Sequence, residues 1–257
     1  MSDAETPEFK VIPAATVVIF RNCPAGGPPE LLMVQRSKEM RFAGGAAVFP
    51  GGRIDPADRE LAQRLAPKGD PLVTAARIAG IRETLEETGL AIALRGPVSA
   101  SEAVDARALL LETGALLPVL ERFGWELDLE RLVPFAHWCP QVDGAFNTRF
   151  FLANLCTGAV DIAVDATENT RLFWASAQRV LELSATREVS VIFPTRRNLE
   201  RLALFASFDA VCAHAAQFPI RMIWAAREQR DGKDWLVIPE GHGYPVTAEL
   251  MSSVMRG

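Results

Sequence analysis

The segment from Pro71 to Gly89 constrains the fold most, because it contains both ends of a helix and two chemically different faces. Proline is tolerated at the first helical position, where its missing N–H needs no partner, and glycine commonly ends a helix. With about 100° of rotation per residue, one face is apolar and carries Ile78, Ile81 and Leu85. The acidic positions share the opposite face: Glu83, Glu86 and Glu87. The sequence therefore predicts a helix anchored in a core that presents three carboxylates away from it.

Strand and helix patterns follow one another irregularly along the rest of the chain. Residues 11–21 and 30–36 are rich in β-branched and aliphatic residues around a Gly/Pro-rich turn, which predicts a β-hairpin. Further strands are expected at 132–138, 147–154 and 171–175. Helical patterns occupy 101–131 and most of the chain from 177, a strand-and-turn tail covers 224–245, and 58–70 is a loop or a short helix. Without regular βα alternation, the prediction is an α+β fold.

Composition excludes several classes of function. The chain has 257 residues, enough for one large domain, and its net charge of −5 does not favour capture of nucleic acid or an anionic membrane. Four scattered cysteines without a CxxC pair, together with three histidines, provide no zinc set. The polar N-terminus lacks a signal-peptide pattern, and the apolar stretches are too short to span a bilayer. A soluble, cytoplasmic protein is expected, with neither nucleic acid nor a membrane as partner.

The acidic helix face has two interpretations on residue chemistry alone. It is either a solvated surface, the commonest fate of a glutamate cluster, or a site for a hard divalent cation. Glu83 and Glu87 stand four residues apart, a like-charge pair that costs about 0.2–0.5 kcal/mol in an isolated helix. Arg82 is the neighbouring charge that offsets this repulsion.

The sequence before the helix favours the metal site. Phe49-Pro50-Gly51-Gly52 precedes Arg82-Glu83-Thr84-Leu85-Glu86-Glu87-Thr88-Gly89-Leu90, and the combination resembles the Nudix hydrolase signature, G-x5-E-x7-R-E-U-x-E-E-x-G-U, with U aliphatic. Gly52 is its first glycine, and the box runs to Leu90. Two features depart from the pattern: Asp58 stands where a mainly structural glutamate is usual, and an insertion of sixteen residues lies at about 59–74. Such insertions are typical of the coenzyme A diphosphatases of peroxisomes and their bacterial relatives.

The resemblance implies a fold and a site. The fold is a Nudix-type α/β/α sandwich around a mixed sheet over residues 1–185, with a helical insert at about 101–131 and a mainly helical extension, 186–257, packed on the same domain. Glu86, Glu87, the carbonyl of Gly51 and the downstream Glu168 are implied as ligands of Mg²⁺ or Mn²⁺, with Asp143 a weaker candidate for the downstream acid. Glu83 is implied as a further ligand or as the general base, and Arg82 as the residue that orients it. For Glu168 a solvated turn is the alternative.

A second motif indicates the substrate. Residues 32–52 resemble the LLTxR[SA]x3Rx3Gx3FPGG motif of the coenzyme A-hydrolysing subgroup, with matches at Arg36, Ser37, Arg41 and Gly45. With Gly52, these positions are implied to bind substrate, since guanidinium groups hold phosphates in a fork. The implied reaction cleaves coenzyme A or acyl-CoA to 3′,5′-ADP and (acyl-)4′-phosphopantetheine. Another nucleoside diphosphate derivative and a non-catalytic nucleotide-binding module remain alternatives, and a homodimer is possible by the same resemblance.

The aromatic residues of the predicted strands have two interpretations. Trp138, Phe146, Phe150 and Phe151 either stack a base and line the path of a pantetheine arm, or belong to the core, where such residues usually lie. Nothing in the local sequence assigns a role to Tyr244, the single tyrosine.

Overall fold

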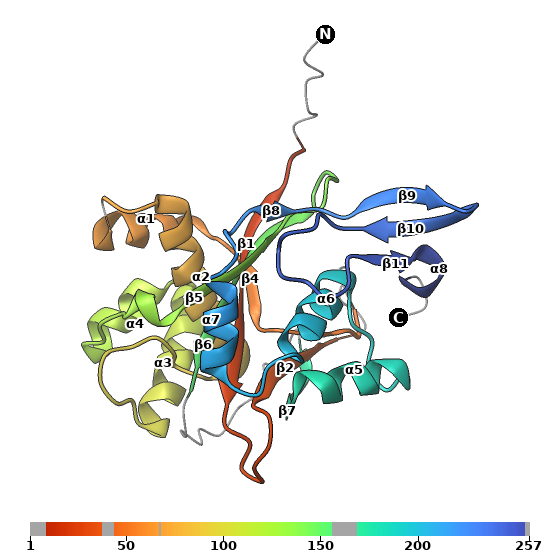
Figure 1. Cartoon of the computed structure of the whole chain (residues 1–257). Coiled ribbons are helices and arrows are strands. Elements are labelled where there is room, and N and C mark those ends of the chain that lie inside the picture. The colour runs from red at the N-terminus through yellow and green to blue at the C-terminus, as the bar shows by residue number, and fades with distance from the viewer. Residues whose placement is uncertain (1–8, 38–43, 67, 156–168, 255–257) are drawn as a thin grey trace, which may run out of the picture.

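The computed structural model describes residues 9–37, 44–66, 68–155 and 169–254. At its centre lies a mixed sheet in the order β3-β2-β1-β6-β5-β8, in which β4 also pairs with β1 and β7 with β2 (Figure 1). Its strands are β1 (Ile12–Arg21), β2 (Glu30–Arg36), β3 (Ala47–Val48), β4 (Gly51–Arg53), β5 (Val133–Trp138), β6 (Phe146–Asn154), β7 (Asn169–Ala175) and β8 (Met222–Ile223). β1 runs parallel to β6 and antiparallel to both β2 and β4. The predicted hairpin is therefore present as β1 and β2.

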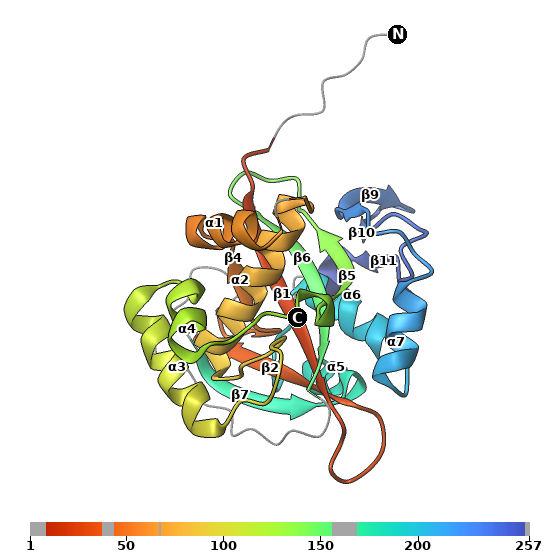
Figure 2. The same cartoon turned by 90° about the vertical axis from the view of Figure 1, so that its left-hand side faces the viewer.

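Helices cover both faces of the sheet (Figures 1 and 2). On one face lie α1 (Pro56–Leu65), α2 (Pro71–Thr88), α3 (Ala100–Thr113), α4 (Leu116–Phe123) and the 3₁₀ turn η1 (Leu129–Arg131). On the other lie α5 (Ala177–Ala185), α6 (Phe193–Leu202) and α7 (Phe208–Ala215). The result is the α/β/α sandwich that the sequence predicts.

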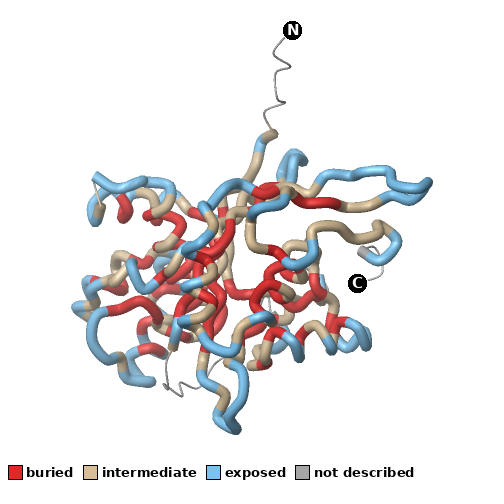
Figure 3. The backbone as a smooth tube through the Cα atoms, viewed as in Figure 1, coloured by how far each residue is buried: buried red, intermediate tan, exposed pale blue. Residues whose placement is uncertain are grey.

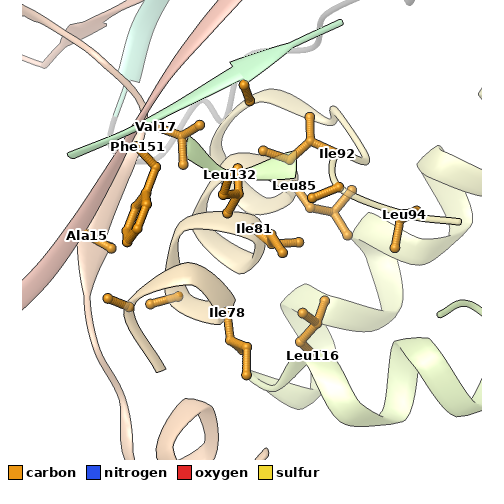
Figure 4. Packing of buried hydrophobic residues seen from close by; sticks show 14 of the residues in the cluster. Ala15, Val17, Ile78, Ile81, Leu85, Ile92, Leu94, Leu116, Leu132 and Phe151 are labelled. Carbon is orange, nitrogen blue, oxygen red and sulfur yellow. The ribbon is translucent and has the colours of Figure 1, made fainter. Parts of the chain in front are cut away.

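Alternation along the strands divides the core into two layers. In β1, Val17 and Ile19 pack with the α1–α4 layer, whereas Val18 and Phe20 pack with the α5–α7 layer. Successive side chains of a strand point to opposite faces, and β1 is buried on both, which explains its nearly continuous apolar sequence. Figure 4 shows the first layer, where Ile78, Ile81 and Leu85 of α2 meet β1 and β6. The apolar face predicted for this helix is confirmed.

The carboxylate helix α2 has the ends that its sequence predicts. The Asp70 side chain accepts hydrogen bonds from the backbone N–H groups of Leu72 and Val73, and Gly89 ends the helix in the left-handed conformation at φ 75°. Thr84, fully buried where the Nudix pattern has an aliphatic residue, donates its hydroxyl to the Gly80 carbonyl at 2.7 Å. A buried polar group is thus satisfied inside its own helix.

The structure adds detail to two segments of the expected fold. Residues 101–131 are helical as expected and form α3, α4 and η1, and Gly114 and Gly124 adopt left-handed conformations that end α3 and α4. The insertion in the Nudix box contains most of α1, which starts at Pro56 behind a capping box made by Asp55 and Asp58. None of the helices in the described ranges combines the length and apolarity needed to cross a bilayer.

The segment after residue 185 contributes to the same core and adds a small sheet. Leu199 and Leu202 of α6 and Val211 of α7 lie in the second core layer with Phe20, and β8 pairs with β5. A three-stranded antiparallel sheet follows, made of β9 (Ala226–Arg230), β10 (Lys233–Val237) and β11 (Ala248–Leu250), before the short α8 (Met251–Val254). Its β9–β10 hairpin projects from the body and is largely exposed (Figures 1 and 3).

Close packing of α2 on β1 makes a stability prediction. A Cβ built on Gly80 would lie 2.8 Å from Cγ2 of the buried Val17. We expect Gly80→Ala to lower the free energy of unfolding by about 1–2 kcal/mol in urea denaturation, since the clash outweighs the helix-propensity gain of about 1 kcal/mol. Gly69→Ala is the control, because its Cβ would meet nothing nearer than 3.4 Å. A Gly80→Ala protein as stable as the wild type would contradict the close packing of Gly80 in α2 against Val17 in β1.

Candidate active site

A cavity of about 500 Å³ opens where α2, β4, the start of β6 and the first turn of α6 meet. Its charged lining residues are Arg36, Arg53, Asp55, Arg82, Glu83, Glu86 and Glu87. Its larger apolar lining residues are Val48, Trp138, Phe146, Phe150, Ile192 and Pro194, and Thr16, Thr148 and Thr195 add hydroxyl groups. The cavity therefore offers both charged and apolar surface to a ligand.

Two glycines allow the backbone to approach the carboxylates closely. A Cβ on Gly51 would lie 2.3 Å from the carbonyl oxygen of Ala15, because β4 pairs with β1 at this point. A Cβ on Gly52 would lie 2.4 Å from the Glu83 carboxyl group. Only glycine leaves this space, so Gly51 allows β4 to pair closely with β1, and Gly52 makes room for the Glu83 carboxylate.

Arg82 is the buried cation of the site, with 3% of its surface exposed. Its Nε donates to Asp58 Oδ1 at 3.1 Å, and one terminal nitrogen reaches both Asp58 Oδ2 at 3.1 Å and the Arg53 carbonyl at 2.8 Å. Burial alone would lower the pKa of Arg82, but the hydrogen bond to Asp58 and the charges of Glu83 and Asp58 raise it above its ordinary value. The guanidinium therefore stays charged and holds α1, α2 and β4 together.

The other terminal nitrogen of Arg82 contacts two of the glutamates. It lies 2.9 Å from Glu83 Oε1 and 3.3 Å from Glu86 Oε2. Burial raises the pKa of Glu83 to about 7, although the adjacent Arg82 opposes the shift. Glu87 is 6% exposed and accepts a hydrogen bond from the Gly51 backbone N–H at 3.0 Å. The acidic face of α2 is thus turned into the cavity, and the solvated-surface interpretation does not describe it.

The donor atoms fit a hard divalent cation in type. Three carboxylates of α2 and the backbone of Gly51 line one side of the cavity, and oxygen is the donor that Mg²⁺ and Mn²⁺ prefer. Arg82 pairs with Glu83 and Glu86, and Arg36 and Arg53 also line the cavity. As the side chains stand, no three His, Cys, Asp or Glu residues of the described ranges converge on one point. Glu83, Glu86 and Glu87 would have to turn from Arg82 and Gly51 toward the ion.

The remaining predicted residues fall into three groups. Arg36 lines the cavity, and its Nε is buried without a hydrogen-bond partner among the described residues. Gly45, at φ 77°, donates its N–H to the carbonyls of Arg36 and Ser37. Arg41 and Glu168 lie outside the described residues.

Asp143, the weaker acidic candidate, does not line the cavity. Its side chain accepts a hydrogen bond from the backbone N–H of Lys10 at 2.8 Å, which places it in an exposed turn.

Several cavity residues were not predicted from the sequence. Arg53 and Asp55 follow Gly52 directly, and their nearness to the motif was the one available signal. Ile192 and Pro194 stand more than one hundred residues after the motif, and the folded chain brings them to the cavity.

Comparisons with known proteins agree with this geometry. No protein-family model matches the chain. It is 25% identical over 260 residues to the acyl-coenzyme A diphosphatase NUDT19 of Gallus gallus, covering 76% of this chain and 69% of that protein. The crystal structure of a Nudix hydrolase from Alicyclobacillus acidocaldarius superimposes with a TM-score of 0.67 at 28% identity, covering 80% of this chain and 97% of the other.

The fold and these similarities define the class. The protein is a hydrolase acting on phosphoric anhydride bonds, and it resembles the Nudix hydrolases. Within that class it resembles the coenzyme A diphosphatase subgroup.

The pair of Arg82 and Asp58 is testable by stability. Asp58→Asn removes the charge of the buried partner (1% exposed), so we expect the free energy of unfolding to fall by about 2–4 kcal/mol in chemical denaturation. Asp128→Asn is the control, because it breaks a pair with Arg131, whose side chain is 62% exposed, and should cost at most about 1 kcal/mol. Equal effects of the two substitutions would show that the buried pair does not hold the site.

Proposed function

We propose that the protein is a divalent-metal-dependent diphosphatase that cleaves coenzyme A or acyl-CoA. The products are 3′,5′-ADP and 4′-phosphopantetheine or its acyl form. One P–O bond of the diphosphate breaks, the oxygen of water joins that phosphorus, and two phosphate monoesters leave. The observation that carries the proposal is the acidic face of α2, held by Arg82 at a cavity that is also lined by arginines and by apolar residues.

The carboxylates have the central role in this proposal. Glu86, Glu87 and the Gly51 carbonyl would hold Mg²⁺ or Mn²⁺, with Glu83 as a further ligand or as acceptor of the proton from the attacking water. When bound, the cation neutralises diphosphate charge and lowers the pKa of water. Arg82 keeps the Glu83 and Glu86 side chains beside Gly52, and so limits their rotamers before a ligand arrives.

The arginines that line the cavity support a substrate with several phosphate groups. The buried Arg36 Nε, without a partner among the described residues, offers a hydrogen bond to a phosphate oxygen, and the exposed Arg53 adds a second guanidinium to the lining. Coenzyme A carries a diphosphate and a 3′-phosphate, together with an uncharged pantetheine arm. The name of the chicken relative supports the same substrate class.

A hydrolysis panel tests the substrate. Coenzyme A, a long-chain acyl-CoA, ADP-ribose, NADH and 8-oxo-dGTP would be incubated with the protein in Mg²⁺ or Mn²⁺, and the products identified by mass. We expect preferential release of 3′,5′-ADP from the two CoA compounds. Cleavage of the other compounds alone would overturn the substrate, and binding without turnover would favour a non-catalytic nucleotide-binding module.

Glu86→Gln tests the metal role. Glu86 has a partly exposed side chain, so the amide should leave the fold intact while removing a ligand charge. We expect kcat to fall by about 100-fold or more, and EDTA to abolish wild-type turnover. Glu121→Gln, an exposed position on α4, is the matched control and should retain full activity. Activity retained by Glu86→Gln would remove this residue from the metal site.

A further inference from the structure

The N-terminus of α6 lies at the cavity and has no side-chain cap. Ile192 occupies the cap position, where its side chain can accept no hydrogen bond, whereas aspartate or serine side chains cap α2, α3, α5 and α7. Ile192, Pro194 and Thr195 all line the cavity. The first N–H groups of a helix attract an anion when no cap satisfies them.

The first turn of α6 leaves backbone donors unused. Arg196 is the first residue of the helix whose N–H makes a helical bond, to the Ile192 carbonyl at 2.9 Å. Pro194 has no N–H to donate. The N–H groups of Phe193 and Thr195 donate to no residue in the described ranges. These N–H groups are therefore available to a ligand.

The Thr195 side chain adds a buried hydroxyl without a partner. Thr195 is 3% exposed, and its hydroxyl makes no hydrogen bond with the described part of the chain. The buried Thr84 and Thr88 differ, because each donates to a carbonyl of its own helix. The Thr195 hydroxyl is also not one of the fully enclosed unpaired atoms, so the small exposed part of this residue includes it. Since buried polar groups are nearly always paired, the unpaired hydroxyl at the cavity indicates a ligand.

The charges near this turn also favour an anion. A helix N-terminus carries partial positive charge and favours acidic side chains, but the first turn of α6 has none, and Arg196 and Arg197 follow it. Arg197 is paired with Glu200 and Glu249. Arg196 donates to the neutral Ser184 hydroxyl at 2.9 Å, so this contact leaves its charge in place.

The segment before α6 is bonded to the segment that follows Arg36. The N–H of Arg36 donates to the Ala46 carbonyl at 3.0 Å, and the N–H of Ala47 donates to the Ser190 carbonyl at 2.8 Å. These backbone bonds join the segments that carry two unpaired donors of the cavity lining, the Arg36 Nε and the Thr195 hydroxyl. Phosphate oxygens accept several hydrogen bonds at once and suit donors of both kinds.

Buried contacts hold α6 in place behind its first turn. The Tyr244 hydroxyl donates to Asn198 Oδ1 in α6 at 2.7 Å and accepts from the indole N–H of Trp138 in β5 at 2.9 Å. Asn198 and Trp138 are 0% and 3% exposed. The Trp138 ring also meets the Phe193 ring edge to face, with centroids 6.1 Å apart. The donors of the first turn are thus fixed before a ligand arrives, which lowers the entropy cost of binding.

We propose that the first turn of α6 is a subsite for a phosphomonoester group of the substrate, which in coenzyme A is the 3′-phosphate. The Thr195 hydroxyl and the N–H groups of Phe193 and Thr195 donate to its oxygens. The inference rests on the proposed function, which takes the diphosphate to the carboxylates of α2. Those carboxylates repel a further phosphate, so the second phosphate needs donors elsewhere in the cavity. Thr195 is then a specificity-determining residue.

Equilibrium binding of nucleotides tests the subsite without turnover. Calorimetry would compare the Kd of 3′,5′-ADP with that of 5′-AMP, which lacks the 3′-phosphate. We expect the wild type to bind 3′,5′-ADP more tightly. Thr195→Val should weaken 3′,5′-ADP binding about tenfold and change 5′-AMP binding less than about twofold, because a hydrogen bond to a charged group is lost. Thr195→Ser keeps a hydroxyl and should keep the preference.

Thr74→Val is the matched control. Thr74 is 6% exposed, lies near the start of α2 and is not part of the cavity lining. The same exchange of a buried threonine for valine should therefore change neither Kd. Unchanged 5′-AMP binding by the Thr195→Val protein shows that this variant is folded.

The outcomes separate the subsite from the proposed reaction. Equal weakening of both nucleotides by Thr195→Val, no weakening of either, or no binding of either to the wild type would overturn the subsite, even if coenzyme A is hydrolysed. Loss of the preference in Thr195→Ser would overturn the role of the hydroxyl. Selective weakening of 3′,5′-ADP by Thr195→Val, with no hydrolysis of either CoA compound, would support the subsite and overturn the reaction.

Discussion

The position of Arg82 is the constraint on which the active site depends. A guanidinium that is 3% exposed must be paired, because an unpaired charge in the interior costs far more than a fold of this size can offset. Its partners come from three elements: Asp58 of α1, Glu83 and Glu86 of α2, and the Arg53 carbonyl of β4. The pairing of this one buried guanidinium therefore fixes the position of α2 relative to Gly51 and Gly52 of β4. The same contacts hold the carboxylates of Glu83 and Glu86 at the cavity. The interactions that stabilise the junction of α1, α2 and β4 are therefore also those that position the candidate metal ligands.

The pairing also explains how a Nudix box accommodates sixteen extra residues. Asp58 stands before the insertion, in the first turn of α1, and Arg82 stands after it, in α2. The additional chain completes α1, whose Leu61 and Ala62 join the core layer on that face of the sheet. Lengthening a loop costs little conformational entropy once its ends are held, so the contact across the insertion survives. An aspartate in place of the usual glutamate still reaches the guanidinium with both oxygens.

Part of the cavity lining comes from the start of α6, far from the Nudix box in the sequence. α6 and α7 pack on the face of the sheet opposite α2, and the first turn of α6 reaches the same opening as the carboxylates. The cavity lining thus combines the carboxylates of α2 with Ile192 and Pro194, which follow the Nudix box by more than one hundred residues.

Local features of the sequence determined the elements that carry the chemistry. Pro71 and Gly89 set the ends of α2, and helical periodicity set which side of it is acidic, because both depend on neighbouring residues only. The strand alternation of β1 likewise follows from its own residues. The helical pattern of 101–131 is confirmed, but its division into α3 and α4 at Gly114 is not visible in a repeat of three and four, which does not register a change in chain direction. The tertiary structure alone decided that the acidic face is turned inward, and that Tyr244 lies between Trp138 and Asn198. Those contacts join residues 46 and 106 positions apart, and they depend on the path of the whole chain, which no local pattern specifies.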